Sequence, residues 1–74
     1  GFTDIPIPKS SVFIGEVGLN GEIRVAKGIN DKIKESIRLG FEEVVVSDKA
    51  EVSSKLKSYC VKINNINDLF KTFF

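Results

Sequence analysis

Residues 12–26 constrain the fold most strongly, because they have the pattern of two β-strands joined by a tight turn. The runs 12–17 and 22–26 are rich in apolar and β-branched residues, and Asn20-Gly21 lies between them. Asn-Gly between two such runs is the strongest short-range signal for a β-hairpin, because the turn requires positive φ angles. We therefore predict an antiparallel hairpin over 12–26. Its second strand should carry Ile23 and Val25 on one face, and Glu22 and Arg24 on the other.

Downstream of the hairpin, helical and strand-like patterns alternate. Isoleucines recur every four residues from Ile29 to Ile37 and predict an amphipathic helix that ends before Gly40. Either Gly28 or Asn30 can act as its N-cap. The other patterns predict an extended lead-in over 4–10, strands over 42–46 and 59–63, and helices over 29–39, 50–57 and 66–73.

The order of these elements indicates the fold class. Three consecutive valines at 44–46 are typical of a strand that is covered on both faces. Strands that alternate with helices indicate βαβ units with right-handed crossovers. We expect an α/β fold, in which a small mixed sheet has an N-terminal β-hairpin followed by β-α units.

Length and composition limit the domain organisation. The 74 residues allow one small domain, so 1–74 is predicted to be a single, partial domain. An apolar share of 42% with 28% charged residues is typical of a folded domain rather than a disordered tail. The chain starts at Gly1 and contains no Met, so we expect it to be a piece of a longer protein. No apolar run approaches the roughly 18–20 residues that span a bilayer, so no membrane partner is expected.

The cysteine and histidine content excludes several kinds of site. Cys60 is the single cysteine, and the sequence contains no histidine. An intrachain disulfide, a zinc finger and a Ser-His-Asp triad are therefore impossible within these residues, and no metal site is expected. Cys60 is predicted to be a small buried hydrophobic residue. Turn, cap or surface positions are predicted for Ser10, Ser11, Ser47, Ser53, Ser54 and Ser58.

Lys32 is the residue with the most chemical interest. At 100° per residue, it lies roughly 60° to one side of Ile29, next to Ser36 and Leu39, at the border of the buried helix face. A half-buried lysine loses hydration, its pKa falls, and it can then act as a general base. The alternative is a lysine whose stem covers the core while its amine reaches water.

Basic residues gather in two parts of the chain. Residues 24–38 hold five cations against two acids, and 52–67 hold three lysines and no acid. Such groups either contact phosphates or form solvated surface. The glycines at 15–28 fit a hairpin better than a phosphate loop, because no helix follows them directly. The candidate DNA-binding residues are Arg24, Lys27, Lys32, Lys34 and Arg38, with Lys55, Lys57 and Lys62 as a second group.

The run VFIGEVGLNGEIR at 12–24 closely resembles the G-E-V-G-L-x-G-E-I-R signature near the C-terminus of the RadA (Sms) family of bacterial DNA repair proteins. The lead-in FTDIPIP at 2–8 is similar to that family's approach to the same strand. Downstream, IKES at 33–36 with LGF at 39–41 resembles the family pattern R-L-K-E-A…L-G-F, and 66–74 resembles its final short helix. The resemblance covers nearly the whole chain, and it is most specific through residue 24.

This resemblance implies a fold and a function. The RadA C-terminal region is similar to the proteolytic domain of Lon, so the chain would be the C-terminal half of a Lon-like fold. It would be a non-catalytic scaffold and DNA-contacting domain of a RadA-type ATPase that acts in DNA repair and homologous recombination. ATP, Mg and Zn are implied for the full-length parent, and no cofactor is expected in this piece. The implied partners are DNA, single-stranded or branched, and further copies in a ring, in the cytoplasm.

An alternative follows from the resemblance to Lon, which uses a Ser-Lys dyad. The Lon lysine lies in a G-[LIV]-x-x-K context after the hairpin, and residues 28–32 fit that spacing, whereas RadA relatives more often carry Arg there. The chain would then be a fragment of an active Lon-type ATP-dependent serine protease, with Lys32 as general base for a serine upstream. No residue is expected to be catalytic in this chain alone. A stand-alone interaction module is a third interpretation, and an exposed sheet edge predicts self-association at high concentration.

Overall fold

The computed structural model describes residues 2–7 and 10–73, with side chains from residue 10 onward. The described strands form one five-stranded sheet in the order β1-β2-β4-β5, and β3 pairs with the end of β2. β2 is antiparallel to β1 and β3, while β2, β4 and β5 run parallel. The mixed α/β fold is therefore confirmed. The elements are β1 (Phe2–Ile7), β2 (Ser11–Val17), β3 (Ile23–Arg24), α1 (Ile29–Arg38), β4 (Glu43–Ser47), the 3₁₀ turn η1 (Lys57–Tyr59), β5 (Cys60–Ile63) and α2 (Ile66–Phe73).

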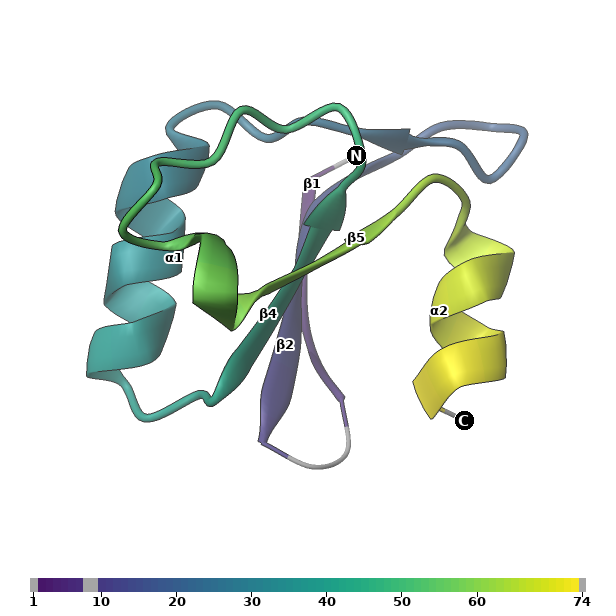
Figure 1. The fold of residues 1–74 in the computed structure, drawn as a ribbon. Coiled ribbons are helices and arrows are strands. Elements are labelled where there is room, and N and C mark those ends of the chain that lie inside the picture. Colours follow the sequence, from purple (N-terminus) through teal and green to yellow (C-terminus); the bar gives the residue numbers. More distant parts are fainter. Residues whose placement is uncertain (1, 8–9, 74) are drawn as a thin grey trace.

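The sheet lies between two helices, with α1 on one face and α2 on the other (Figure 1). Successive residues of the central strands point to opposite faces, so Val44 and Val46 pack on the α1 side and Val45 on the α2 side. All three valines have no exposed surface, which confirms the prediction of a strand covered on both faces. The larger α1-side cluster adds Val12, Ile14, Ala26, Ile29, Ile33, Ala50, Val52 and Leu56, and the α2-side cluster adds Phe13, Ile23, Ile63 and Leu69.

α1 confirms its predicted position within one residue. Gly28 is the N-cap with φ 65°, and Gly40 follows the helix with φ 101°, a conformation that side chains disfavour. The Phe41 N–H donates to the Ser36 carbonyl at 3.1 Å, and the Gly40 N–H donates to Ile37 at 3.0 Å. This is a Schellman end, and it folds Phe41 back onto the α1-side cluster.

The predicted hairpin is present, but its second strand is shorter than expected. β3 contains only Ile23 and Arg24, whereas the expected strand ran to residue 26. Ile23 is buried on the α2 side of the sheet, while Val25 packs against the α1-side cluster. The expectation that they share a face is therefore wrong. The chain must leave the sheet after Arg24 because α1 begins four residues later on the opposite face.

The predicted helix over 50–57 is wrong. These residues form an irregular segment that ends in η1. The Asn30 side chain accepts a hydrogen bond from the Ser53 N–H at 2.9 Å and donates to the Glu51 carbonyl at 3.3 Å. These bonds hold the segment against α1 in a non-helical path, and Val52 and Leu56 are buried there.

The chain before β2 also differs from expectation. The extended lead-in is a full strand, β1, because residues 2–7 pair antiparallel with residues 11–16 of β2. Two of the serines predicted to lie in turns, caps or at the surface, Ser11 and Ser47, are buried instead. The Ser47 hydroxyl donates to the Ile23 carbonyl at 3.2 Å and so ties β3 to β4. Residues 8–9 of the lead-in lie outside the described residues. Within 2–7 and 10–73, no helix has the length and apolar character that crossing a membrane requires.

Phe13→Ala should lower the free energy of unfolding by about 3–5 kcal/mol, because it leaves a cavity in the α2-side cluster. The Phe13 side chain is completely buried. Urea denaturation followed by circular dichroism measures the change. The matched control is Phe70→Ala, because Phe70 is 54% exposed on α2 and should cost about 1 kcal/mol or less. Equal losses for both variants would contradict the burial of Phe13.

Candidate functional site

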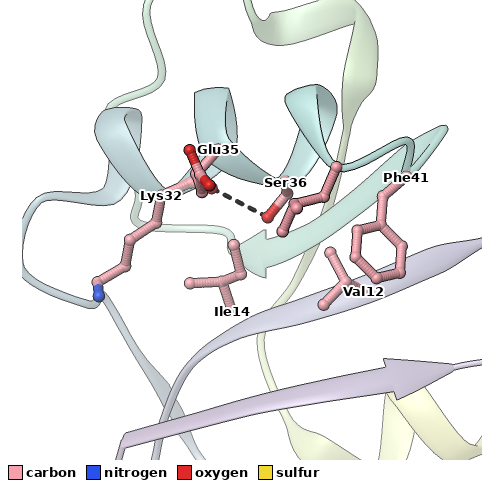
Figure 2. Close-up of a pocket in the computed structure, with 7 residues that line it drawn as sticks. Val12, Ile14, Lys32, Glu35, Ser36 and Phe41 are labelled. Atoms are coloured by element: carbon pink, nitrogen blue, oxygen red, sulfur yellow. Dashed lines mark hydrogen bonds between the residues drawn. The ribbon is translucent and has the colours of Figure 1, made fainter.

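A surface pocket of about 360 Å³ lies between α1 and β2 (Figure 2). Apolar side chains from both elements form its floor, and polar groups of α1 lie along one side. Phe41, which the helix end folds back, closes the end of the pocket near Val12. The lining residues are Val12, Ile14, Lys32, Glu35, Ser36, Leu39 and Phe41.

Lys32 lies at the border of the buried helix face, as its helical angle predicts. Its side chain is half-buried and lines the pocket together with Ser36 and Leu39. Figure 2 shows its stem running beside Ile14 and its amine at the end of the pocket far from Phe41. The aliphatic stem therefore covers core, while the charged end lies at the pocket rim.

Ser36 is the serine nearest to Lys32 along the helix face, one turn away. Its hydroxyl donates to the Lys32 backbone carbonyl at 2.9 Å (Figure 2). A serine nucleophile needs a base that accepts its proton, and here the proton is held by a helix carbonyl. The pair Lys32 and Ser36 is therefore not arranged as a dyad.

The helix separates the candidate DNA-binding residues. Because residues two apart on a helix are about 200° apart, Lys32 and Lys34 lie on opposite flanks of α1. Arg38 forms an ion pair with Glu35, and its hydrogen bond holds the pKa of the Glu35 carboxyl below the ordinary value. Arg24 pairs with Glu22 at 3.6 Å. The remaining candidate, Lys27, is exposed before α1.

A second arrangement of lysines emerges from the fold. Lys34 lies one turn beyond Asn30, on the flank of α1 that binds the irregular segment through Glu51 and Ser53. That segment continues into Lys55 and Lys57, both exposed, and its Leu56 is buried in the same cluster as Ile33. The structure thus brings together the two basic regions of the sequence. We call Lys34, Lys55 and Lys57 the lysine face.

The turn between β2 and β3 is tightly hydrogen-bonded. The Gly18 N–H donates to the Glu22 carbonyl at 2.9 Å, and the Gly21 N–H donates to the Gly18 carbonyl at 3.0 Å. The Glu22 carboxylate accepts from the Asn20 N–H at 3.1 Å and lies over Gly18, where a Cβ would be only 1.9 Å from Oε1. This rigid turn holds Leu19 completely in solvent, with a relative accessibility of 105%.

Cys60 is half-buried at the start of β5, and its thiol donates to the Leu56 carbonyl at 3.4 Å. Burial raises the pKa of this thiol, and the nearby Lys62 opposes that shift more weakly. A thiol with a raised pKa is a poor nucleophile at neutral pH. The described residues contain no group of three His, Cys, Asp or Glu side chains that could hold a metal ion.

The fold and the site define a small mixed α/β domain with a rigid hairpin, a mainly apolar pocket and a lysine face. Over 69 residues, 93% of this chain, it is 35% identical to the DNA repair protein RadA of Rickettsia typhi. It is also 36% identical over 61 residues to RadA of Campylobacter jejuni, and 42% identical over 45 residues to RadA of Bacillus subtilis. The chain belongs to the RadA family.

The matched regions are a small part of each relative. They cover 16% of the Rickettsia typhi protein, 14% of the Campylobacter jejuni protein and 10% of the Bacillus subtilis protein. They include 93%, 82% and 61% of this chain, respectively. No protein-family model matches the chain. The family is therefore established by these relatives, of which the chain spans at most about one sixth.

Cys60 should make stability depend on pH in the alkaline range. Its pKa is raised in the folded state, so the unfolded chain loses the thiol proton first as pH rises. The contribution of the thiol is fully present below its unfolded pKa of about 8.5 and is lost as pH rises through the folded pKa. Urea denaturation between about pH 7 and pH 10 should show wild type losing more stability than Cys60→Ala. Parallel pH curves for the two proteins would contradict this assignment.

Proposed function

We propose that this chain has a RadA-related role in DNA repair and serves as a non-catalytic scaffold and DNA-contacting domain. The proposal extends to a Lon-like fold for the complete domain and to homologous recombination for the parent. The parent would be a cytoplasmic ATPase, with ATP, Mg and Zn bound outside this piece, that assembles in a ring. Support for the role comes from the RadA relatives, which cover up to 93% of the chain.

The lysine face is the observation that carries DNA contact. Lys34, Lys55 and Lys57 are exposed and have no ion pair within the described residues. Asn30 binds the segment that precedes Lys55, so lysines from two separate regions lie on adjoining elements. Phosphate contacts need cations that are not already neutralised by carboxylates, and this set meets that requirement better than Arg24 or Arg38. A role in phosphate contact remains a prediction for Arg24, Lys27, Lys32 and Arg38.

The second candidate function is a fragment of a Lon-type serine protease. The observation in its favour is the position of Lys32 at the rim of an apolar pocket, where a substrate side chain could lie. The Ser36 hydroxyl is held by the Lys32 carbonyl, so the nucleophile would have to come from a segment upstream. The absence of a dyad within the described residues favours the scaffold.

The lysine face should give DNA binding a salt dependence that substitutions reduce. The affinity for a single-stranded oligonucleotide, measured by fluorescence anisotropy, should fall as salt rises, with a slope of roughly 0.7 per phosphate contact on a log–log scale. The triple substitution Lys34→Gln, Lys55→Gln and Lys57→Gln should make that slope shallower by about two. The reason is that each lysine releases the counterions of one phosphate.

The matched control for this prediction is Lys71→Gln. Lys71 is exposed on α2, which covers the other face of the sheet from α1 (Figure 1). It removes one charge without touching the lysine face, so its slope should match wild type, while Lys34→Gln alone should reduce the slope by about 0.7. An unchanged slope in the triple variant would exclude the lysine face as the DNA contact.

The 74-residue chain should not cleave peptide bonds. Casein carrying a quenched fluorophore should release no signal above buffer, because Ser36 is held by a backbone carbonyl and no complete dyad is present. Lys32→Met should leave the result unchanged. Release that depends on Lys32 would favour the protease over the scaffold.

A further inference from the structure

We infer that the domain associates head to tail with a second copy of itself, by inserting Leu19 into the pocket between α1 and β2. The contact uses two different surfaces of the same chain, one from each partner. It is independent of the proposed DNA contact, because neither surface includes the lysine face. The inference rests on the exposure and rigidity of Leu19, the shape and lining of the pocket, and their placement at opposite ends of one strand.

Leu19 has the properties of an interface anchor. A relative accessibility of 105% leaves its whole side chain in water, which is unfavourable for an apolar group of this size. Leu19 does not sit on a loose loop, because hydrogen bonds of Gly18, Asn20 and Gly21 close the turn beneath it. A rigid turn loses little conformational entropy when its tip becomes buried, so the anchor is preorganised.

The pocket has the properties of the complementary surface. Its volume of about 360 Å³ can accept a leucine side chain together with part of the turn that carries it. Val12, Ile14, Phe41 and Leu39 supply apolar walls, and Leu39 itself is 63% exposed at the rim. Apolar anchors that fill apolar pockets are the usual centres of protein interfaces. Occupation by Leu19 would therefore remove two exposed leucines from water at once.

The geometry requires a second chain. Val12 lies near the start of β2, whereas Leu19 lies just beyond its end, and seven residues of strand span roughly 23 Å. The whole domain measures 31 Å along its longest axis. Figure 1 shows the β2–β3 turn projecting away from the start of β2. Leu19 therefore cannot reach the pocket of its own chain, and a contact between different surfaces of two copies is heterologous.

The charges around the two surfaces are complementary. The hairpin carries two carboxylates, Glu16 and Glu22, against the single guanidinium of Arg24. The pocket rim carries Lys32 in addition to the mutually paired Glu35 and Arg38. An acidic anchor segment therefore approaches a rim with excess positive charge. Complementary potentials of this kind favour the head-to-tail orientation over contact between two hairpins.

Sedimentation velocity on the 74-residue chain tests the inference. Between about 10 µM and about 1 mM, the weight-average sedimentation coefficient of wild type should rise, and species larger than a dimer should form, because each copy has one anchor and one pocket. Leu19→Asp and Leu39→Glu should each weaken association by about tenfold or more, since each removes an apolar partner. Phe70→Asp, a substitution of an exposed aromatic residue on α2, should associate as wild type does.

A mixing experiment separates this contact from every other mode of association. Leu19→Asp keeps an intact pocket, and Leu39→Glu keeps an intact anchor, so an equimolar mixture has one working interface. The mixture should form a 1:1 dimer and nothing larger, although each variant alone stays monomeric. Circular dichroism confirms that both variants are folded.

Three results would overturn the inference. Wild type that remains monomeric over the whole range would show that the anchor does not bind a second copy. Association that survives both substitutions would indicate pairing of sheet edges instead. Loss of association in both variants without recovery on mixing would indicate that two like surfaces meet.

Discussion

The parallel pairing of β2 with β4 is the contact on which the rest of the structure depends. Two parallel neighbours cannot be joined by a tight turn, so the chain must cross over one face of the sheet before β4 begins. That crossing contains the hairpin turn and α1, and it places Ile29 and Ile33 over the sheet. Because β4 is apolar on both faces, the opposite face needs its own cover, which α2 provides through Leu69.

The crossover also generates every feature that we connect with function. α1 carries Lys32 toward the pocket on one flank and Lys34 on the other, where Asn30 binds the irregular segment. One helix thus divides the basic residues into two groups with different surroundings. The same side chain, Asn30, explains both the loss of the expected helix and the meeting of lysines that are far apart in sequence.

The hairpin that most resembles the RadA signature has a structural basis for its glycines and its glutamate. Gly18 lies beneath the Glu22 carboxylate, and Gly21 has a positive φ of 82°. A side chain at either position would disturb the turn, the first by contact and the second by backbone strain. The consequence is a turn that is closed by its own hydrogen bonds and leaves Leu19 exposed. The signature therefore accounts for a rigid projection from the sheet as well as for a hairpin.

Local patterns were sufficient for the elements whose signals lie within a few residues. The Asn-Gly turn, the isoleucine spacing of α1 with its glycine ends, the valines of β4 and the last helix were all predictable, and so was the border position of Lys32. Contacts between distant residues settled the remainder: β1 became a strand by pairing with β2, Asn30 kept 50–57 out of a helix, and Val25 crossed to the α1 side. The other walls of the pocket, from β2 and Phe41, belong to this second group. The reason is physical, because hydrogen-bond partners and buried neighbours from separate segments override weak local preferences once the chain is compact.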